Sequence, residues 1–358
     1  MNWPLHGSNP QYIYQFLNIP MPDEIIDFSV NLNPLGPPSR IKEKWSDWLP
    51  LIEDYPDPHG SALVERISHQ EGLTNEQVIL GNGGADIIRL LANVFSGKRV
   101  LLIQPTFAEY EQMCRAYGCH ISHFVLSEGE WHILLEALIP KLAEHDVVFL
   151  CHPNNPTGIV YPKSRLLEII KACQMYNCYL VVDEAFYDFA EDGSTLAPIV
   201  NDVEHVIIIR SLTKMFSLAG LRLGYGIAHP QMIKKLKNLQ AHWNVNALAL
   251  AAGEECFQGD EYEAETRAFI TRERKRVLAT LRSAGWLTSN SQVNFYILRD
   301  PELNDQLPLF KHLLRCGLVP RHTVNYRGLN GRWMRFAIRQ KEENDLLLEG
   351  LSAWKNNR

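Results

Sequence analysis

The stretch VIIIRSLTKMFSLAGLR, residues 206–222, carries the most information about the fold class and the kind of site in this chain. An apolar run, Val206–Arg210, is followed by Ser211 and Lys214, and Arg222 stands eight residues beyond the lysine. Continuous β-branched residues are typical of a strand that is buried on both faces of a sheet. Polar groups that follow such strands gather at the carboxyl edge of the sheet, where ligands bind.

A second apolar run, Tyr179–Asp183, ends upstream in a carboxylate. Pyridoxal 5'-phosphate (PLP) requires such a set: a lysine for its aldehyde, an aspartate for its pyridine nitrogen, and groups that hold its phosphate. We therefore predict Lys214 and Asp183 as catalytic and cofactor-binding residues, with Ser211 and Arg222 on the phosphate. The alternatives are a solvated surface lysine and a capping aspartate. The first is disfavoured because Lys214 follows the run Val206–Arg210 among Ser and Thr residues, and the second because a buried carboxylate is costly unless it is paired.

Seven strand-like runs alternate with amphipathic stretches through the middle of the chain, which predicts an α/β fold with a mostly parallel seven-stranded sheet. Besides the two runs above, the expected strands are Gln77–Leu80, Arg99–Ile103, Ile121–Leu126, Asp146–Cys151 and Leu223–Ala228. The expected helices between them are Ala85–Val94, Ala108–Tyr117, Ile133–Ile139 and Lys163–Tyr176.

The pattern changes after about residue 245. A long helix is expected over Asp260–Ala284, followed by strands at Phe295–Leu298, Leu318–Arg321 and Trp333–Ile338 and by a helix from Lys341. We predict a large PLP-binding domain over 46–245 and a smaller α+β domain formed by 1–45 and 246–358.

The composition excludes several classes of protein. With 46% hydrophobic and 21% charged residues the chain is typical of a globular protein, and its net charge of −6 offers no footprint for nucleic acid. No apolar run is long enough to span a membrane, and no signal pattern opens the chain, so we expect a cytoplasmic protein. The seven cysteines contain no Cys-x-x-Cys pair and are odd in number, so neither a disulfide framework nor a metal site is predicted.

Three further motifs follow expected strands. The backbone N–H groups of Gly84 and Ala85, at the start of a helix after a glycine-rich turn, can bind a phosphate, although the turn alone is equally consistent with a plain tight turn. Phe107 can stack on a flat heteroaromatic ring or can be a core aromatic. Asn155, in a turn rich in proline and asparagine, can donate its amide to the phenolate oxygen of PLP.

These motifs resemble the fold-type I PLP-dependent enzymes, and in particular the histidinol-phosphate aminotransferase group. The resemblance rests on Asn155-Pro-Thr-Gly, Asp183, the Ser-x-x-Lys sequence that ends at Lys214, and Arg222, and it extends to residues 31–36 (Asn-Leu-Asn-Pro-Leu-Gly). It covers essentially the whole chain and implies the fold-type I PLP-dependent transferase fold.

Within that group several residues resemble the threonine-phosphate decarboxylases. The segment His6-Gly-Ser-Asn is similar to their His-Gly-Gly-Asn start, from which Ser8 departs. Leu32 and Phe186 stand where the aminotransferases usually have glutamate and tyrosine, so the tyrosine hydroxyl that would bond the phenolate is missing. The residues leave open which bond at the substrate's Cα is held perpendicular to the cofactor ring, and hence which bond breaks.

The resemblance implies PLP-dependent decarboxylation of O-phospho-L-threonine to (R)-1-amino-2-propanol O-phosphate, for the aminopropanol arm of cobalamin. It implies substrate contacts from His6, Asn31, Arg321 and Arg335, with Arg339 either a contact or a surface ion-pair residue. It also implies that Tyr55 reaches the cofactor phosphate of a neighbouring subunit, which requires a homodimer with shared active sites. The alternative is a histidinol-phosphate aminotransferase or a related transaminase. A non-catalytic PLP-binding regulator is disfavoured, because the chain has no spare DNA-binding domain.

Overall fold

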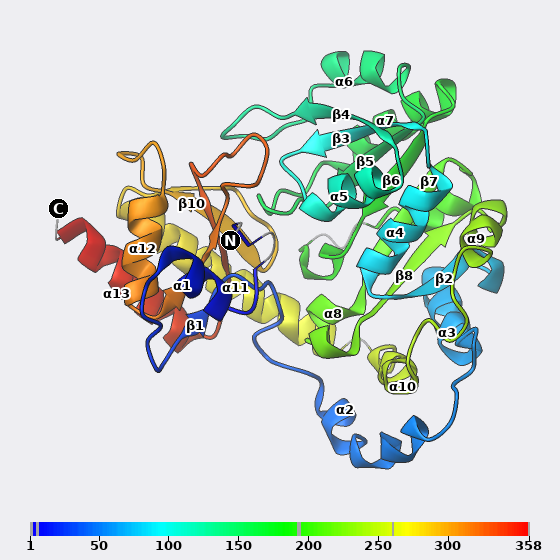
Figure 1. Cartoon of the computed structure of the whole chain (residues 1–358), viewed down its shortest axis with the longest axis horizontal. Coiled ribbons are helices and arrows are strands. Elements are labelled where there is room, and N and C mark those ends of the chain that lie inside the picture. The colour runs from blue at the N-terminus through cyan, green and yellow to red at the C-terminus, as the bar shows by residue number, and fades with distance from the viewer. Residues whose placement is uncertain (1–2, 5–6, 192–194, 260, 357–358) are drawn as a thin grey trace.

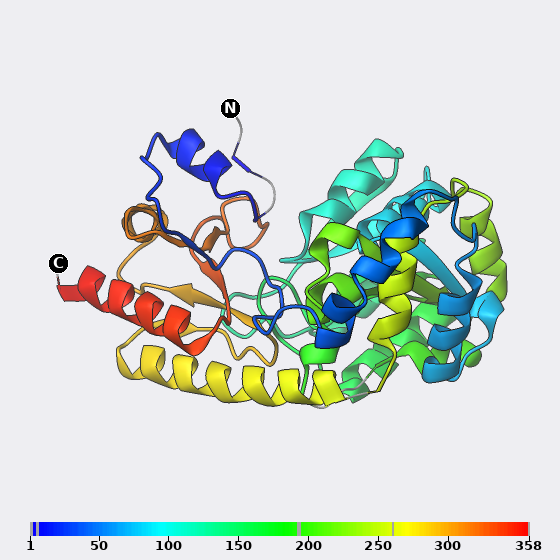
Figure 2. The ribbon, with the colours of Figure 1, turned by 90° about the horizontal axis from the view of Figure 1, so that it is seen from below.

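The computed structural model describes residues 3–4, 7–191, 195–259 and 261–356. The chain forms a larger part around one sheet and a smaller part around another, and the two lie side by side (Figure 1). The N-terminal segment and the last helix both belong to the smaller part (Figure 2).

Seven strands form the large sheet, in the order β2-β8-β7-β6-β5-β3-β4. All neighbours pair in parallel except β8, which is antiparallel to both β2 and β7. The strands are β2 (Val78–Asn82), β3 (Arg99–Gln104), β4 (His120–Val125), β5 (Val147–Cys151), β6 (Tyr179–Asp183), β7 (Val206–Ser211) and β8 (Leu223–Ala228).

Helices cover both faces of this sheet, which is why its central strands are apolar throughout. On one face, α4 (Gly84–Val94), α5 (Ala108–Ala116) and α9 (Pro230–Lys237) pack on strand residues such as Val100 and Leu102. Leu101 and Ile103 point to the opposite face and belong to the other core, since side chains alternate along a strand. That core also includes α3 (Ser61–Glu71), α6 (Leu135–Leu142), α7 (Lys163–Met175) and α10 (Ala247–Cys256).

The smaller part is built on an antiparallel sheet with the order β12-β13-β10-β9. Its strands are β9 (Leu287–Thr288), β10 (Phe295–Arg299), β12 (Arg321–His322) and β13 (Met334–Ala337), and the separate pair β1 (Ile26–Asp27) and β11 (Leu318–Val319) is parallel. Around them lie α1 (Gln11–Leu17), α11 (Glu261–Ser283), α12 (Leu307–Arg315) and α13 (Lys341–Asn356). The long α11 runs under this part toward the larger one (Figure 2).

Two short elements, α2 (Ser39–Glu43) and the 3-10 helix η1 (Ser46–Ile52), lead from the N-terminal segment to α3 of the larger part, and the short α8 (Leu212–Met215) follows β7. Further 3-10 turns are η2 (Asn75–Gln77), η3 (Tyr187–Phe189), η4 (Ala197–Asn201) and η5 (Ala219–Leu221). The side chain of Arg40 in α2 donates to the carbonyl of Glu255 in α10, 2.7 Å away. The division into domains at 45/46 and 245/246 stays a prediction.

The predicted fold class is confirmed, including the seven-stranded and mostly parallel sheet. One predicted strand is wrong. The run Leu318–Arg321 is interrupted at Pro320, which has no backbone N–H to donate, and it divides into β11 and β12 of two different sheets. All seven cysteines are free thiols, as expected. Among the described residues, no helix combines the length and the apolar character that crossing a lipid bilayer requires.

Candidate active site

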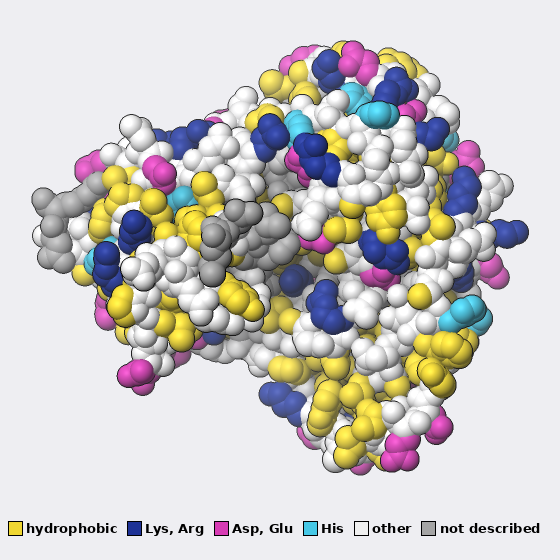
Figure 3. All heavy atoms as spheres, in the orientation of Figure 1, with side chains coloured by type: hydrophobic (Ala, Val, Ile, Leu, Met, Phe, Trp, Pro, Cys, Tyr) yellow, Lys and Arg dark blue, Asp and Glu magenta, His cyan; other side chains and the backbone are white. Residues whose placement is uncertain are grey.

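A cavity of about 550 Å³ lies where the carboxyl ends of β5, β6 and β7 face the smaller part. The cavity is lined by three cationic side chains, those of Lys214, Arg222 and Arg335. Among the described residues that line it, only Asp183 carries a carboxylate. Lys and Arg side chains are visible at the hollow between the two parts (Figure 3). This balance of charge suits an anionic ligand.

One end of the cavity has groups that favour an anion. Gly84 and Ala85 open α4 there, and the first-turn N–H groups of a helix favour an anion. Gly83, just before the helix, has a φ of +77°, and a Cβ atom added to it would lie 2.4 Å from Nη2 of Arg222. Glycine at this position therefore allows both the turn and the approach of the guanidinium.

Hydroxyl groups from the end of β7 complete this region. Oγ of Ser211 lies 2.7 Å from Oγ1 of Thr213, and both residues line the cavity. On β8, Gly224 brings the sheet against the start of α4, because a Cβ atom there would lie 2.6 Å from the backbone nitrogen of Gly84. The hydroxyl groups and the helix N-terminus can therefore act on one anion.

Lys214 enters the cavity from α8. Its Nζ makes no hydrogen bond or ion pair with any residue that the structure describes. Burial first, and then the positive charges of Arg335 and Arg222, together lower the pKa of Lys214 from 10.5 to about 8. Asp183 opposes this shift. The site thus holds an amine that is partly neutral near pH 8, as a nucleophilic lysine must be.

Asp183 ends β6 and is buried. Its Oδ2 accepts a hydrogen bond from the Tyr110 hydroxyl at 2.5 Å, and its Oδ1 accepts one from the backbone N–H of Ala185 at 3.0 Å. Burial raises the pKa of Asp183, whereas these two donors and the charge of Lys214 lower it. The carboxylate therefore has support for its ionised form in a place that disfavours charge.

A buried ion pair links the carboxyl ends of β6 and β7. Arg210, next to Ser211 on β7, donates from Nε to Oε2 of Glu184, next to Asp183, at 2.9 Å. The guanidinium also donates to Oγ1 of Thr195 at 2.6 Å and lies over the ring of Tyr187. Breaking such a buried pair on one side leaves an uncompensated charge, so the strand ends are held firmly relative to each other.

Arg335 reaches the cavity from β13. It donates to Oδ1 of Asn155 at 2.6 Å and to the backbone carbonyl of Ser29 at 2.6 Å, while its Nε has no partner among the described residues. Because the Asn155 oxygen is occupied, the amide NH₂ of Asn155 is the group left to donate. Arg335 and Asn155 are thereby held as one unit at the junction of the two parts.

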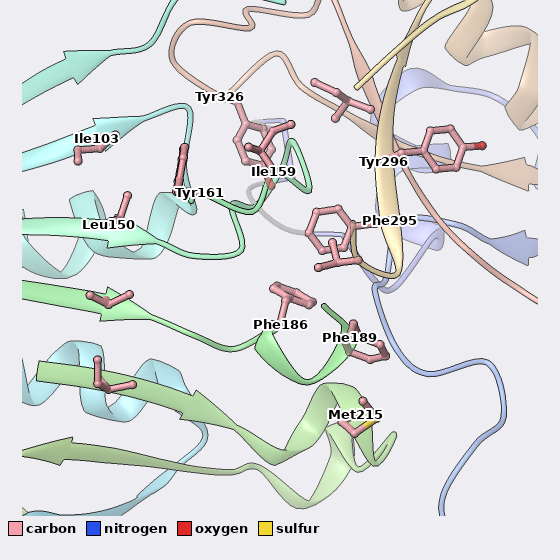
Figure 4. Close-up of a cluster of buried hydrophobic side chains, with 14 of the residues drawn as sticks. Ile103, Leu150, Ile159, Tyr161, Phe186, Phe189, Met215, Phe295, Tyr296 and Tyr326 are labelled. Carbon is pink, nitrogen blue, oxygen red and sulfur yellow. The ribbon is translucent and has the colours of Figure 1, made fainter. Parts of the chain in front are cut away.

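The wall beside this unit is apolar. Phe186, which follows β6, and Phe295, which opens β10, meet edge to face with ring centroids 4.8 Å apart. Figure 4 shows the two rings facing each other from the two parts of the molecule, with Tyr326 above them. Because residue 186 is a phenylalanine, this wall of the cavity presents no hydroxyl group at that position.

The cavity gathers ten of the predicted site residues, namely Gly84, Ala85, Phe107, Asn155, Asp183, Ser211, Lys214, Arg222, Asn31 and Arg335. Arg321 is buried beside them but lines a neighbouring smaller cavity, where it donates to the carbonyl of His322 and to Asn325. Tyr55 is 80% exposed and packs against Trp243 outside the cavity, with the two rings tilted and their centroids 4.5 Å apart. Arg339 pairs with Glu343 at 2.6 Å, which is the ion-pair alternative. His6 lies outside the described residues.

Sequence reasoning missed several residues that line the cavity or support it. Thr213 could have been found, because it stands between Ser211 and Lys214 in a segment already identified. Tyr326 and Tyr110 gave no such signal. Tyr326 lies in the connection between β12 and β13, and Tyr110 meets Asp183 only through the tertiary fold.

Comparison with known proteins agrees with this geometry. The family model for aminotransferase class I and II matches residues 23–351. The chain belongs to this family. Enzymes of the family depend on PLP, and this member is a PLP-dependent enzyme as well.

Three similar proteins of this family and fold are informative. The chain is 34% identical over 352 residues to a threonine-phosphate decarboxylase of Salmonella typhimurium, which covers 97% of this chain and 95% of that protein. It is 28% identical to an adenosylcobalamin biosynthesis bifunctional protein of Leptospira interrogans, over 98% of this chain and 41% of that protein. The crystal structure of a histidinol-phosphate aminotransferase from Clostridium acetobutylicum superposes with a TM-score of 0.88 at 30% identity, over 92% of this chain and 99% of that one.

The residues present fit PLP. The cavity offers a partly neutral amine without a partner among the described residues, a buried carboxylate held by two donors, and a helix N-terminus beside which Gly83 allows the close approach of Arg222. These features match the aldehyde, the pyridine nitrogen and the phosphate of PLP in turn.

Proposed function

We propose that this chain is a threonine-phosphate decarboxylase, which converts O-phospho-L-threonine to CO₂ and (R)-1-amino-2-propanol O-phosphate. The observation that carries the proposal is the 34% identity to a threonine-phosphate decarboxylase over 97% of this chain. Similarity to a bifunctional enzyme of adenosylcobalamin biosynthesis supports the aminopropanol arm of cobalamin as the destination of the product.

The residues that would hold the cofactor follow from the chemistry of the cavity. Lys214 is the amine for its aldehyde, and Asp183 is the acceptor for the pyridine N–H. Gly84, Ala85, Ser211 and Arg222 would hold the phosphate, Phe107 would stack on the ring, and Asn155 would donate to the phenolate oxygen. When bound, PLP supplies an electron sink for the pair of electrons left when a bond to Cα breaks.

Lys214 is also the group best placed to move a proton. With cofactor and substrate bound, its Nζ would donate a proton to Cα in place of the carboxylate that leaves as CO₂. A pKa of about 8 lets the amine both lose and regain that proton near neutral pH. No bond to Cβ is broken, so the configuration at Cβ is retained, in agreement with an (R) product.

The substrate has anionic ends that suit the guanidinium groups. Arg335 presents an Nε without a partner among the described residues and lies beside Asn31, whose Oδ1 is likewise buried without one. A guanidinium binds a carboxylate or a phosphate through two parallel hydrogen bonds. Arg321, together with His6, is proposed as a further substrate contact.

We propose a homodimer with shared active sites. Large apolar side chains are exposed around Tyr55, including Leu49, Ile52 and Trp243. Hydrophobic side chains gather over the end of the larger part where α2 and η1 lie (Figure 3). An exposed apolar patch of this kind is typical of a protein interface, and Tyr55 at its edge could then reach the site of the partner.

A histidinol-phosphate aminotransferase is the second candidate, favoured by the TM-score of 0.88 and the 30% identity to such an enzyme. It would use the same lysine to remove the proton at Cα. The apolar wall formed by Phe186 and Phe295 favours the decarboxylase, because the hydroxyl group that the aminotransferases usually place at position 186 is absent.

Product analysis separates the two candidates. The purified full-length enzyme with PLP is supplied with O-phospho-L-threonine, first without and then with 2-oxoglutarate. We expect CO₂ and aminopropanol phosphate without any keto acid. Turnover of histidinol phosphate that depends on 2-oxoglutarate, with no CO₂ from O-phospho-L-threonine, would assign the chain to the aminotransferases instead.

A further inference from the structure

Tyr110 is a buried tyrosine of α5 that the proposed chemistry does not use. It stands three residues after Phe107, and its side chain is fully enclosed. Its hydroxyl reaches across to β6 and lies 2.5 Å from Oδ2 of Asp183. A tyrosine hydroxyl is costly to bury without a partner, and here its partner is the carboxylate of the candidate site.

The direction of this hydrogen bond follows from the chemistry of the two groups. An ionised carboxylate has only acceptor sites, so Tyr110 must be the donor. Oδ1 accepts from the backbone N–H of Ala185, which leaves each carboxylate oxygen with a donor from the protein. Hydrogen bonds to a charged acceptor are stronger than those between neutral groups, so the pair of donors favours the ionised and oriented form.

The ring of Tyr110 contacts a second residue of the site. It meets the ring of Phe107 edge to face, with centroids 5.8 Å apart and an interplanar angle of 83°. On its other side it packs on Phe149 of β5, with centroids 5.5 Å apart. One side chain therefore supports both Phe107, the proposed stacking residue, and Asp183, the proposed partner of the pyridine nitrogen.

We propose that Tyr110 is a positioning residue that holds Asp183 ionised and oriented, and Phe107 in place, for the pyridine ring of the cofactor. This inference rests on the cofactor roles proposed above for Asp183 and Phe107. It does not depend on which bond at Cα the enzyme breaks, because both candidate reactions need the same ring in the same place.

Tyr110→Phe tests the proposal, since it removes the hydroxyl and keeps the ring that packs on Phe107. Tyr161→Phe is the matched control. Tyr161 is also buried in the larger part, and its hydroxyl has no hydrogen-bond partner among the described residues. Both variants lose one buried oxygen atom, but only the first loses a donor to Asp183.

The readout is the dissociation constant of PLP, measured by equilibrium dialysis of the full-length holoenzyme between pH 6 and pH 9. The titratable groups that face Asp183 are Tyr110 from α5, Cys151 from β5, Lys214 from α8 and the adjacent Glu184. Without the Tyr110 donor the pKa of Asp183 rises, so the carboxylate is neutralised at a higher pH and affinity is lost earlier as the pH falls. We expect a dissociation constant about tenfold higher at pH 6 for Tyr110→Phe, a smaller difference at pH 9, and a change below about twofold for Tyr161→Phe.

A double-mutant cycle with Asp183→Asn separates positioning from a general effect on the fold. Asparagine carries no charge to stabilise, so Tyr110→Phe should change the affinity by less than about twofold in that background. The proposal is overturned if Tyr110→Phe binds PLP like Tyr161→Phe at every pH, or if its full effect persists beside Asp183→Asn. An unsubstituted chain that binds no PLP would overturn the cofactor assignment itself, and this proposal with it.

Discussion

The low pKa of Lys214 gives a quantitative prediction for the apoenzyme. An amine attacks an aldehyde only in its neutral form, and the pKa of about 8 sets how much of that form is present. At pH 7 the neutral fraction is about 9% for a pKa of 8 and about 0.03% for the ordinary value of 10.5, a ratio of roughly 300. Covalent capture of PLP by the apoenzyme should therefore rise with pH, reach its midpoint near pH 8 and level off above about pH 9.

Arg335→Met tests the cause of this shift. The charge of Arg335 is the second largest contribution after burial, and removing a positive neighbour favours the protonated amine, which raises the pKa of Lys214. An increase of half a unit would lower the neutral fraction at pH 7 about threefold. Arg321→Met is the matched control, because Arg321 is also buried near the site but is not among the contributions to the Lys214 pKa.

Stopped-flow absorbance of apoenzyme mixed with PLP between pH 6 and pH 10 measures the midpoint directly. We expect a midpoint near 8 for the unsubstituted chain and for Arg321→Met, and a higher one for Arg335→Met. A midpoint above 10 in the unsubstituted chain would refute the reasoning, and so would equal midpoints in the two variants.

Three more predictions concern the cofactor end of the cavity, the apolar wall and the dimer. Gly83→Ala would place a Cβ atom 2.4 Å from the Arg222 guanidinium at a φ of +77°, so we expect at least about a tenfold loss of PLP affinity in dialysis, together with a lower thermal midpoint of the apoenzyme because the backbone there is strained for alanine. Phe186→Tyr restores a hydroxyl on the wall, and we expect more 2-oxoglutarate-dependent transamination relative to CO₂ release; an unchanged product ratio would make Phe186 irrelevant to the choice of bond. Tyr55→Ala and Lys214→Ala should each be nearly inactive, whereas a co-refolded mixture should regain up to about a quarter of full activity, because one in four sites then combines an intact lysine with an intact partner tyrosine if the subunits mix randomly.

The bounds of the buried strands were predictable from the sequence where an apolar run meets a polar residue. Tyr179–Asp183 and Leu223–Ala228 have the predicted bounds, because each apolar run stops at a clear change of residue type. The break at Pro320 was missed, because Leu318 and Val319 before it are typical strand residues and a proline can stand at the edge of a strand.

The site was predictable only for residues that are close to one another in the chain or that belong to a motif. The contact between Tyr110 and Asp183 joins α5 to the end of β6, and that of Arg335 with Asn155 joins the two parts of the molecule. Contacts of this kind depend on how helices and strands pack, and no spacing in a single sequence encodes them. Tyr55 differs again, because its predicted role requires a second copy of the chain.

The antiparallel course of β8 explains the distance in sequence between Lys214 and Arg222. Ser211 at the end of β7 pairs with Gly224 at the start of β8, so residues 212–222 form a loop that leaves and re-enters the sheet at one edge. A parallel strand would have required a crossover, and Arg222 would then begin its strand at the opposite edge. Lys214 and Arg222 thus both lie in one loop, residues 212–222, whose two ends are held together by the pairing of Ser211 with Gly224. An insertion within this loop would therefore displace the Lys214 amine and the Arg222 guanidinium relative to each other. An insertion in a crossover elsewhere in the sheet would leave the distance between these two groups unchanged.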